Sequence, residues 1–350
     1  LYTRVGGIRG ILDGQGMQAQ IATPSAAAFD QAGNMYFTDS SDSTIKKMDS
    51  SGNVTTVAGQ SQNPGYADDI GTNAQFSYPF GMVVDSAGNI YVSDMNNCVI
   101  RKIDTSFNVT TFAGYGGYGG SDGDQPSASF AYPAHMAIDS LNNIYVADSN
   151  GCTIRKIDTL GNTTTIVGQF EAFSLQDGQG TNAMFNYPYG IAVDPAGNLY
   201  IADSNNTAIR FVDTSLNVTT IAGTSWGFQD GQGTNAMFNY PMAVALDASG
   251  NLYIADSNNY VVRKMDSSYN VTTVVGTPNG YGNLAGPVLS SNIGYLNGIA
   301  IGNEGMYLMD TDFSLIRLAT SGTNSSASLA TTTPITMIAP DYPPASRLSL

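Results

Sequence analysis

The sequence predicts an all-β protein, a six-bladed β-propeller made of four-stranded antiparallel blades. The first supporting observation is a repeat: the decapeptide GNLYIADSNN stands at residues 197–206 and again at 250–259, and six related segments occur at intervals of 53 to 55 residues. The second is that each repeat contains four short runs rich in Val, Ile, Tyr and Thr, separated by Gly, Asn and Asp. Runs of this kind indicate strands and tight turns. A long period with four strands per unit is typical of propeller blades.

The repeat that starts at residue 187 shows the four strands of one blade. We call them strand A (YPYGIAVD, 187–194), strand B (NLYIAD, 198–203), strand C (AIRFVD, 208–213) and strand D (NVTTIAG, 217–223). Strand A is expected beside the ring axis and strand D at the rim, because blades of a propeller radiate outward from a central channel.

Both ends of the chain contain a candidate for the outer strand of the last blade. Residues 1–7, LYTRVGG, resemble strand D, so we expect them to close the ring and the propeller to span residues 1–323. The Ser/Thr/Pro-rich tail at 324–350 contains a second candidate strand, TPITMIAP at 333–340. Two strands then compete for one sheet edge. Either one of them adds as a fifth strand, or one pairs with a neighbouring molecule, and we expect the C-terminal tail to do so.

The segment GNLYIADSNNTAIRFVDTSLNVTTIAG at 197–223 resembles the NHL-repeat family of β-propellers. The linking segment DGQGTNAMFNYPYGIAVD at 177–194 is similar to NHL repeats of secreted or surface proteins. The resemblance covers about residues 1–320, and the sixth copy departs from it, with LNGIAIG at 296–302. It implies the propeller fold and leaves the function open, since propellers carry many unrelated activities.

Aspartates recur at fixed places in the repeats. Five begin the A–B turns, six end the B strands and five begin the C–D turns. We expect each to close a turn by accepting hydrogen bonds from nearby backbone N–H groups. Strand C carries most of the basic residues, as in IRKID at 100–104, so we also expect ion pairs with the aspartates that end strand B. Those are Asp39, Asp94, Asp148, Asp203, Asp256 and Asp310.

The charge of the chain excludes one class of partner. With 28 acidic and 13 basic residues the net charge is −15, which argues against nucleic-acid binding because phosphate contacts need clustered Lys and Arg. No run of 18 apolar residues occurs, so no membrane span is expected.

Two short motifs resemble catalytic signatures, and neither has the context that its chemistry needs. GYGGYG at 114–119 matches a dinucleotide-binding pattern, which requires a strand–helix junction in a βαβ unit. GTSWG at 223–227 matches a nucleophile elbow, which requires an α/β sheet and a histidine after the serine. The only histidine is His135, and it precedes Ser225. We predict that the chain is not an enzyme.

The residue after each strand-A proline varies between repeats and is expected to line one mouth of the channel. Phe80, Tyr189, Met242 and Asn297 occupy this position in four copies, and His135 follows it by one residue in the third. These five are our candidates for a ligand-binding site. The alternative is that they only fill the axis.

No cofactor or metal is expected. One histidine cannot hold zinc alone, and DGQG at 13–16, 177–180 and 230–233 lacks the oxygen ligands of a calcium loop, so we interpret it as a turn. The phenylalanine that follows it, as in AMF at 183–185, is expected to pack between blades. Cys98 and Cys152 occupy equivalent places in adjacent blades, too far apart for a disulfide bond, which requires Cα atoms within about 7 Å.

N-linked glycosylation is expected at the start of strand D, on the exposed rim. The motif N-x-[ST] occurs there at Asn53, Asn108, Asn162, Asn217 and Asn270, and Asn205 and Asn324 are weaker candidates. The alternative is that these motifs carry no sugar and arise from local structure alone, since Asn favours tight turns and Thr favours strands.

These observations favour a non-enzymatic module located outside the cell or at its surface. We expect it to be structural or to bind proteins, as a glycosylated subunit of a surface assembly or fibre that self-associates through a terminal strand. The alternative is a small-ligand binder, or a lactonase-like or synthase-like enzyme, that uses the channel mouth.

Overall fold

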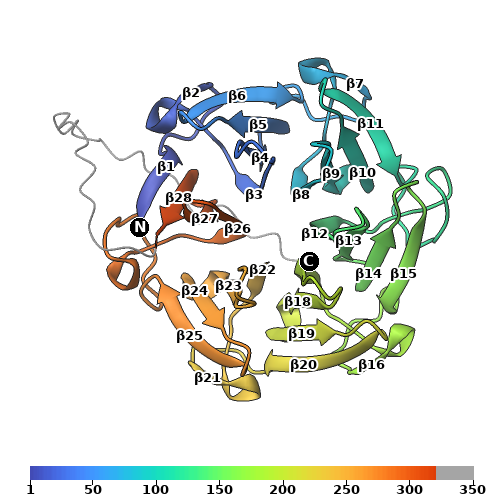
Figure 1. The fold of residues 1–350 in the computed structure, drawn as a ribbon, viewed down its shortest axis with the longest axis vertical. Coiled ribbons are helices and arrows are strands. Elements are labelled where there is room, and N and C mark those ends of the chain that lie inside the picture. The colour runs from blue at the N-terminus through green and yellow to red at the C-terminus, as the bar shows by residue number, and fades with distance from the viewer. Residues whose placement is uncertain (321–350) are drawn as a thin grey trace. The chain divides into compact units, whose positions relative to one another are not determined.

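Six antiparallel sheets surround a common axis in the computed structural model, and the predicted six-bladed propeller is confirmed (Figure 1). The structure describes residues 1–320, and the candidate strand at 333–340 lies outside them. Within residues 1–320, no helix is both long and apolar enough to cross a membrane.

The strands of each blade follow the predicted order A to D from the axis to the rim. The A strands are β3 (Pro24–Phe29), β8 (Pro79–Val84), β12 (Pro133–Ile138), β17 (Pro188–Val193), β22 (Pro241–Leu246) and β26 (Leu296–Gly302). The B strands are β4 (Met35–Asp39), β9 (Ile90–Asp94), β13 (Ile144–Asp148), β18 (Leu199–Asp203), β23 (Leu252–Asp256) and β27 (Gly305–Asp310). The C strands are β5 (Thr44–Met48), β10 (Val99–Ile103), β14 (Thr153–Ile157), β19 (Ala208–Val212), β24 (Val261–Met265) and β28 (Leu315–Ala319). The D strands are β6 (Asn53–Ala58), β11 (Asn108–Ala113), β15 (Thr163–Gly168), β20 (Asn217–Gly223), β25 (Asn270–Val275) and β1 (Tyr2–Gly6).

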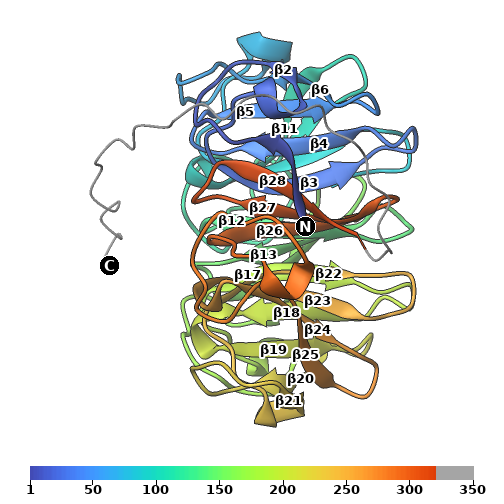
Figure 2. The ribbon, with the colours of Figure 1, turned by 90° about the vertical axis from the view of Figure 1, so that its left-hand side faces the viewer.

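The N-terminal strand completes the last blade. β1 pairs antiparallel with β28, with Tyr2 opposite Leu318 and Gly6 opposite Leu315. Figure 2 views the ring from its side and shows the N-terminus close to β28. Because β1 comes from the other end of the chain, this pairing joins the first and last repeats and closes the ring.

Four of the six sheets contain a fifth strand that the sequence analysis did not predict. Two residues of each linker pair with the start of a D strand: β2 (Gly14–Gln15), β7 (Asp69–Ile70), β16 (Gly178–Gln179) and β21 (Gly231–Gln232). Three of these strands lie within the DGQG segments, so these segments are edge strands as well as turns. The aspartate just before each of these short strands accepts a further backbone N–H group from the outer edge of the D strand. Asp177, for example, accepts the backbone N–H of Thr220 at 3.1 Å. Covered edges do not offer unpaired backbone groups to other chains.

The core lies between the blades, and a repeated phenylalanine packs in four of the six gaps, with Ile21 and Ile293 in the other two. Phe185 is fully buried and packs with Tyr145 of the third blade and Leu199 of the fourth. Phe238 packs in the same way between the fourth and fifth blades. The predicted packing of these phenylalanines between blades is confirmed.

The turn aspartates act as predicted in the A–B and C–D turns. Asp194 accepts the backbone N–H groups of Ala196 and Asn198 at 2.9 Å, and its other oxygen accepts the Asn198 side-chain amide at 2.8 Å. Asp213 makes the equivalent contacts with Ser215 and Asn217. These short-range hydrogen bonds close the turns without any partner from another blade.

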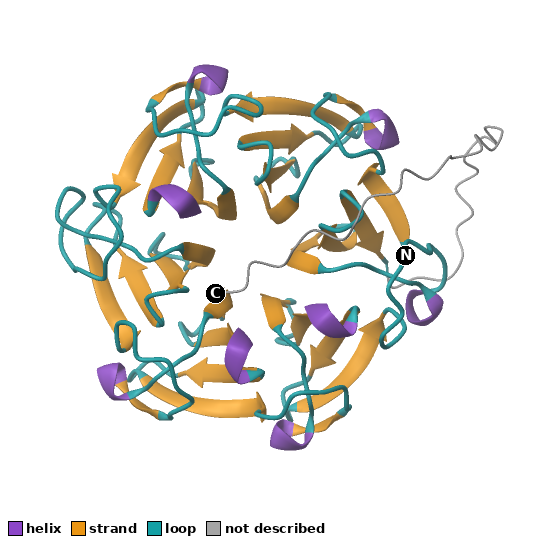
Figure 3. Cartoon of the chain, turned by 180° about the vertical axis from the view of Figure 1, so that it is seen from behind, coloured by secondary structure: helices purple, strands orange, loops and turns teal. Residues whose placement is uncertain are grey.

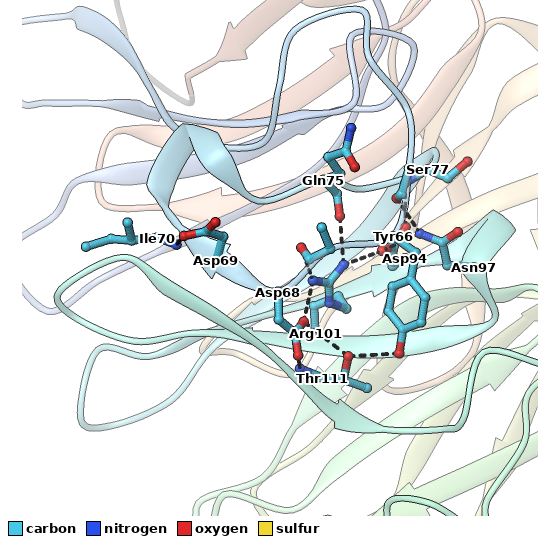
Figure 4. A network of polar contacts seen from close by, with 12 residues as sticks. Tyr66, Asp68, Asp69, Ile70, Gln75, Ser77, Asp94, Asn97, Arg101 and Thr111 are labelled. Atoms are coloured by element: carbon cyan, nitrogen blue, oxygen red, sulfur yellow. Dashed lines mark hydrogen bonds and ion pairs between the residues drawn. The ribbon is translucent and has the colours of Figure 1, made fainter.

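The prediction was wrong for the aspartates that end strand B, because they do not close turns. Asp94 is buried and binds the Arg101 side chain at 2.8 Å, the Asn97 amide at 2.8 Å and the backbone N–H of Ser77 at 2.7 Å (Figure 4). Asp68, from the linker, binds the same guanidinium. Arginine therefore ties strand C both to strand B and to the preceding linker, and the predicted pairing of these two strands is confirmed.

Five blades share the bond to a linker aspartate, with Lys46 in place of arginine in the first, where it lies 3.9 Å from Asp42 of the B–C loop rather than bonding to Asp39. The buried cations are Lys46, Arg101, Arg155, Arg210 and Arg263, paired with Asp13, Asp68, Asp122, Asp177 and Asp230 of the linkers. In the sixth blade Arg317 binds Asp310 and the side chain of Asn283, which takes the place of the linker aspartate.

Candidate functional site

The two ends of the strands differ, and we name each by its connections. The A–B and C–D turns lie at one end, which we call the turn face. The B–C loops lie at the other end, which we call the connection face, and the D–A linkers begin and return there. Figure 3 shows the linkers as teal loops that run between the outer strands and the axis.

Both sets of connections contain short 3₁₀ helices. The B–C loops contain η3 (Met95–Asn97), η5 (Ser204–Asn206) and η7 (Ser257–Asn259). The linkers contain η1 (Gly16–Gln18), η2 (Gly71–Asn73), η4 (Gly180–Asn182), η6 (Gly233–Asn235) and η8 (Val288–Ser290).

All five candidates for the channel mouth lie on the innermost strands, and several contact one another. The rings of Phe80 and His135 are 4.9 Å apart, and those of Phe80 and Tyr189 are 6.1 Å apart. His135 Nε2 donates to the backbone carbonyl of Asn297, 2.7 Å away, and so joins the third blade to the sixth. The Asn297 side chain donates to Ser25 Oγ at 3.0 Å. These contacts span the axis and fill it with side chains.

His135 is held in its neutral form. Burial lowers its pKa from 6.5 to about 4, and the hydrogen bond to the Asn297 carbonyl opposes this shift only in part. The side chain is 8% exposed. At neutral pH His135 is therefore an uncharged hydrogen-bond donor that links two blades.

The sequence analysis missed a ring of tyrosines at the position before the strand-A proline. Tyr78, Tyr132, Tyr187 and Tyr240 have φ between 52° and 59°, a left-handed conformation that bulky residues rarely adopt. Tyr78, Tyr240 and Tyr295 pack over Phe80 and Met242 on the connection face. The recurring Tyr-Pro dipeptide could have drawn attention to these tyrosines. Their left-handed backbone conformation could not be predicted from it.

A second set of aromatic residues lies further out on the connection face. Tyr118, Phe173, Trp226 and Tyr281 occupy equivalent places, since each pairs through its backbone with the residue twelve positions later. All four are exposed, and Trp226 is 74% exposed. In the first blade the equivalent residue is Arg9, so these aromatic residues belong to blades three to six.

Several of these rings contact a tyrosine of the inner ring or a neighbouring loop. Phe173 lies 5.3 Å from Tyr187, and Tyr118 lies 6.0 Å from Tyr132. Tyr118 also donates its hydroxyl to Glu171 at 2.8 Å. We call Tyr118, Phe173, Trp226 and Tyr281 the aromatic layer of this face, after the equivalent places that they occupy around the ring. Of the two short motifs, GYGGYG contributes Tyr118 to the layer and GTSWG contributes Trp226.

The five sequon asparagines that begin strand D, or immediately precede it, have exposed side chains that are engaged in turns. The amide of Asn53 donates to Asp49 at 2.9 Å, and that of Asn217 donates to Asp213 at 2.9 Å. The A–B turns make the same contact where no sequon exists, as between Asn198 and Asp194. Turn closure therefore accounts for these asparagines, and their glycosylation stays a prediction.

The other predicted features are placed as follows. Cys98 and Cys152 are buried free thiols, and burial raises the pKa of Cys152 to about 11. Within residues 1–320, no group of three or more His, Cys, Asp or Glu side chains is arranged to hold a metal ion.

The repeat can now be compared with known proteins. Residues 185–210 match the model of the NHL repeat. The chain is an NHL-repeat β-propeller. NHL repeat-containing protein 2 of Homo sapiens is 33% identical over 180 residues, which is 47% of this chain and 25% of that protein.

Two further matches extend over more of this NHL propeller. Protein SUPPRESSOR OF QUENCHING 1, chloroplastic, of Arabidopsis thaliana is 27% identical over 278 residues, 74% of this chain and 26% of that protein. The chain thus spans about a quarter of the length of these curated relatives. An auxiliary nutrient binding protein from Bacteroides ovatus has the same fold, with a TM-score of 0.67 and 16% identity over 90% of this chain and 75% of that one.

Proposed function

We propose that this NHL propeller is a non-enzymatic interaction module of the cell surface or exterior that binds its partner through the aromatic layer of the connection face. The observation that carries the proposal is the exposure of Trp226, Phe173 and Tyr281 at equivalent places of successive blades. Exposed aromatic patches are costly to keep in water and mark binding surfaces. The auxiliary nutrient binding protein with this fold is named for binding, which also favours such a role.

The second candidate function uses the axis. Tyr189 and Tyr240 lie over the packed residues of the axis and are half-buried, so a small ligand or substrate would have to bind above them. The hydrogen bond that joins His135 to the opposite blade favours structural use of the axis instead.

Variants of the two surfaces separate these functions. The full chain is tested for binding on arrays of glycans, extracellular proteins and peptides, beside a variant with Phe173→Ala, Trp226→Ala and Tyr281→Ala. We expect a ligand that the native chain binds and this variant does not. Leu141→Ala with Leu160→Ala changes two exposed residues of the turn face and is the matched control. If the triple variant binds normally and Tyr189→Phe abolishes binding, the axis is the site and the proposal is wrong.

Glycosylation and self-association are further parts of the proposal. The exposure of the five strand-D asparagines supports N-linked glycans, and a native mass that enzymatic deglycosylation leaves unchanged would refute them.

Among the described residues no further strand pairs with the outer edge of β1, which supports strand addition there. Deleting residues 324–350 should abolish oligomers and leave the propeller folded. A truncated chain that assembles as before would contradict this part.

A further inference from the structure

Blades four and five carry the same set of side chains on the connection face. Each has an exposed aromatic ring from the linker, Phe173 or Trp226, beside an asparagine that precedes the inner tyrosine. The sequences around these groups are the most similar of all the repeats, DGQGTNAMFNYP at 177–188 and at 230–241. Because β17 and β22 contact each other around the ring, the two sets are neighbours.

In blade five the indole ring is held in place although it is exposed. Trp226 Nε1 donates to Asn239 Oδ1 at 2.8 Å, and Asn258 Nδ2 donates to the same oxygen at 3.2 Å. The backbone of Gly227 donates to the Phe238 carbonyl at 3.0 Å and holds the linker down. A ligand that binds the indole face therefore meets a ring that is already ordered, which lowers the entropic cost of binding.

Blade four repeats the arrangement with a different ring. Asn205 Nδ2 donates to Asn186 Oδ1 at 3.4 Å, the counterpart of the Asn258–Asn239 contact. The Phe173 ring is held against Tyr187, 5.3 Å away. In the other four blades the residue at the position of Asn186 is alanine, serine or glycine, so the asparagine pair is limited to these two blades.

The asparagine pairs keep hydrogen-bonding capacity for a ligand. The Nδ2 groups of Asn186 and Asn239 donate to no other described residue, and the Oδ1 atom of Asn258 accepts from none. Each set thus offers amide donors and acceptors next to an aromatic ring.

Charge at this end of blades four and five is neutralised within the protein. Asp177 and Asp203 bind Arg210, and the equivalent pair of aspartates binds Arg263. Glu171, on the same linker as Phe173, binds Tyr118 of blade three. A cationic ligand would therefore find little unpaired negative charge here, although the whole chain is acidic.

We propose that the Phe173–Asn186–Asn205 and Trp226–Asn239–Asn258 sets are two equivalent subsites for a neutral polysaccharide. A pyranose ring has a face of C–H groups that packs on an aromatic ring and a rim of hydroxyls that both donate and accept hydrogen bonds, which matches an uncharged aromatic and amide surface. Two adjacent subsites bind one polymer chain more tightly than either binds alone. This inference rests on the proposed function and names its ligand class.

The test is affinity electrophoresis of the full chain through gels that contain a soluble β-glucan, α-glucan, mannan, galactan or xylan. We expect retardation by at least one polymer. Trp226→Ala and Phe173→Ala should each weaken binding by about tenfold or more, and the double variant should migrate as in a gel without polymer. Trp226→Phe keeps a ring and should retain part of the affinity, whereas Leu160→Ala on the turn face should change nothing. Thermal unfolding of each variant verifies that it is folded.

Two results would overturn the inference. One is normal migration of the native chain in every polymer, and the other is retardation that the Trp226→Ala and Phe173→Ala variants retain. If the native chain instead binds a protein or a peptide on the arrays, and these variants lose that binding, the connection face is a binding surface as proposed and only the polysaccharide assignment fails.

Discussion

The two faces of this propeller are built from the same strands but are stabilised differently. On the turn face of the first five blades, each turn is closed by an aspartate and an asparagine four residues later, as with Asp194 and Asn198. On the connection face, the ends of the strands are held by buried arginines that reach residues far away in the sequence, as Arg210 reaches Asp177. The connection face thus depends on long-range contacts that hold its loops, and those loops differ between blades. The layer of paired charges therefore lies beneath loops that differ between blades, whereas the turns at the other end repeat with little change.

Breaking the layer of paired charges should have the largest effect. Arg210 binds Asp203 at 2.6 Å and Asp177 at 2.8 Å, and also donates to two backbone carbonyls. Arg210→Met leaves Asp203 buried without its cation, and we expect a loss of about 3–5 kcal/mol in the free energy of unfolding by urea. Arg210→Lys is the natural control, because Lys46 occupies this place in the first blade, and it should lose less. A loss below about 1 kcal/mol for the methionine variant would show that the paired charges do not stabilise this face.

The two faces should respond to pH in opposite directions. Burial raises the pKa of Asp203 and of Asp256 to about 6, despite the arginine beside each. A raised pKa in the folded state favours the folded protein as pH falls from about 7 toward 4, because the folded state then holds protons that the unfolded state has released. Hydrogen bonds from Asn217 and Asn270 lower the pKa values of Asp213 and Asp266 on the turn face, so their stabilisation is lost as pH falls below about 4.

Melting temperature measured against pH tests this difference. We expect it to rise between pH 8 and about pH 5, by an amount equivalent to about 1–2 kcal/mol, and to fall below about pH 4, because the raised pKa values of the buried aspartates together outweigh the lowered pKa of His135, which acts in the opposite direction. Asp256→Asn should remove part of the rise, and Asp213→Asn part of the fall. A melting temperature that increases steadily from pH 5 to pH 8 would contradict the sign of the predicted shift.

Opening one turn on the turn face should have a smaller effect. Asp194→Ala removes the acceptor for the backbone N–H groups of Ala196 and Asn198, which then bond to water. We expect a loss of about 1 kcal/mol in the free energy of unfolding, because the turn is at the surface and water replaces the lost partner. If the loss equals that of Arg210→Met, the two faces do not differ in the way described.

Removing an exposed ring from the connection face should change stability least. Trp226 is exposed and its backbone keeps its contacts without the indole, so Trp226→Ala should change the free energy of unfolding by less than about 0.5 kcal/mol. Binding through this face should nevertheless weaken by about tenfold or more. A strongly destabilised variant would mean that the indole is part of the fold rather than of a binding surface.

The sequence by itself determined the features that are local or repeated. The number of blades, the order of the strands and the closing of the turns follow from patterns within about 54 residues, because strand alternation and turn chemistry act between near neighbours in the chain. The variable position after the strand-A proline also located the axis, since residues that differ within a constant repeat stand out.

Only the tertiary structure decided which groups meet across longer separations. Asp203 pairs with Arg210 as predicted, but it does not close a turn, and its other oxygen accepts the backbone N–H of Asn186, 17 residues earlier. The asparagine pairs, the left-handed tyrosines and the contact between His135 and Asn297, 162 residues apart, were equally invisible in the repeat pattern. The physical reason is that these contacts depend on where each linker returns over the blade and on how opposite blades face each other, which is set by the packing of the closed ring and not by any local preference.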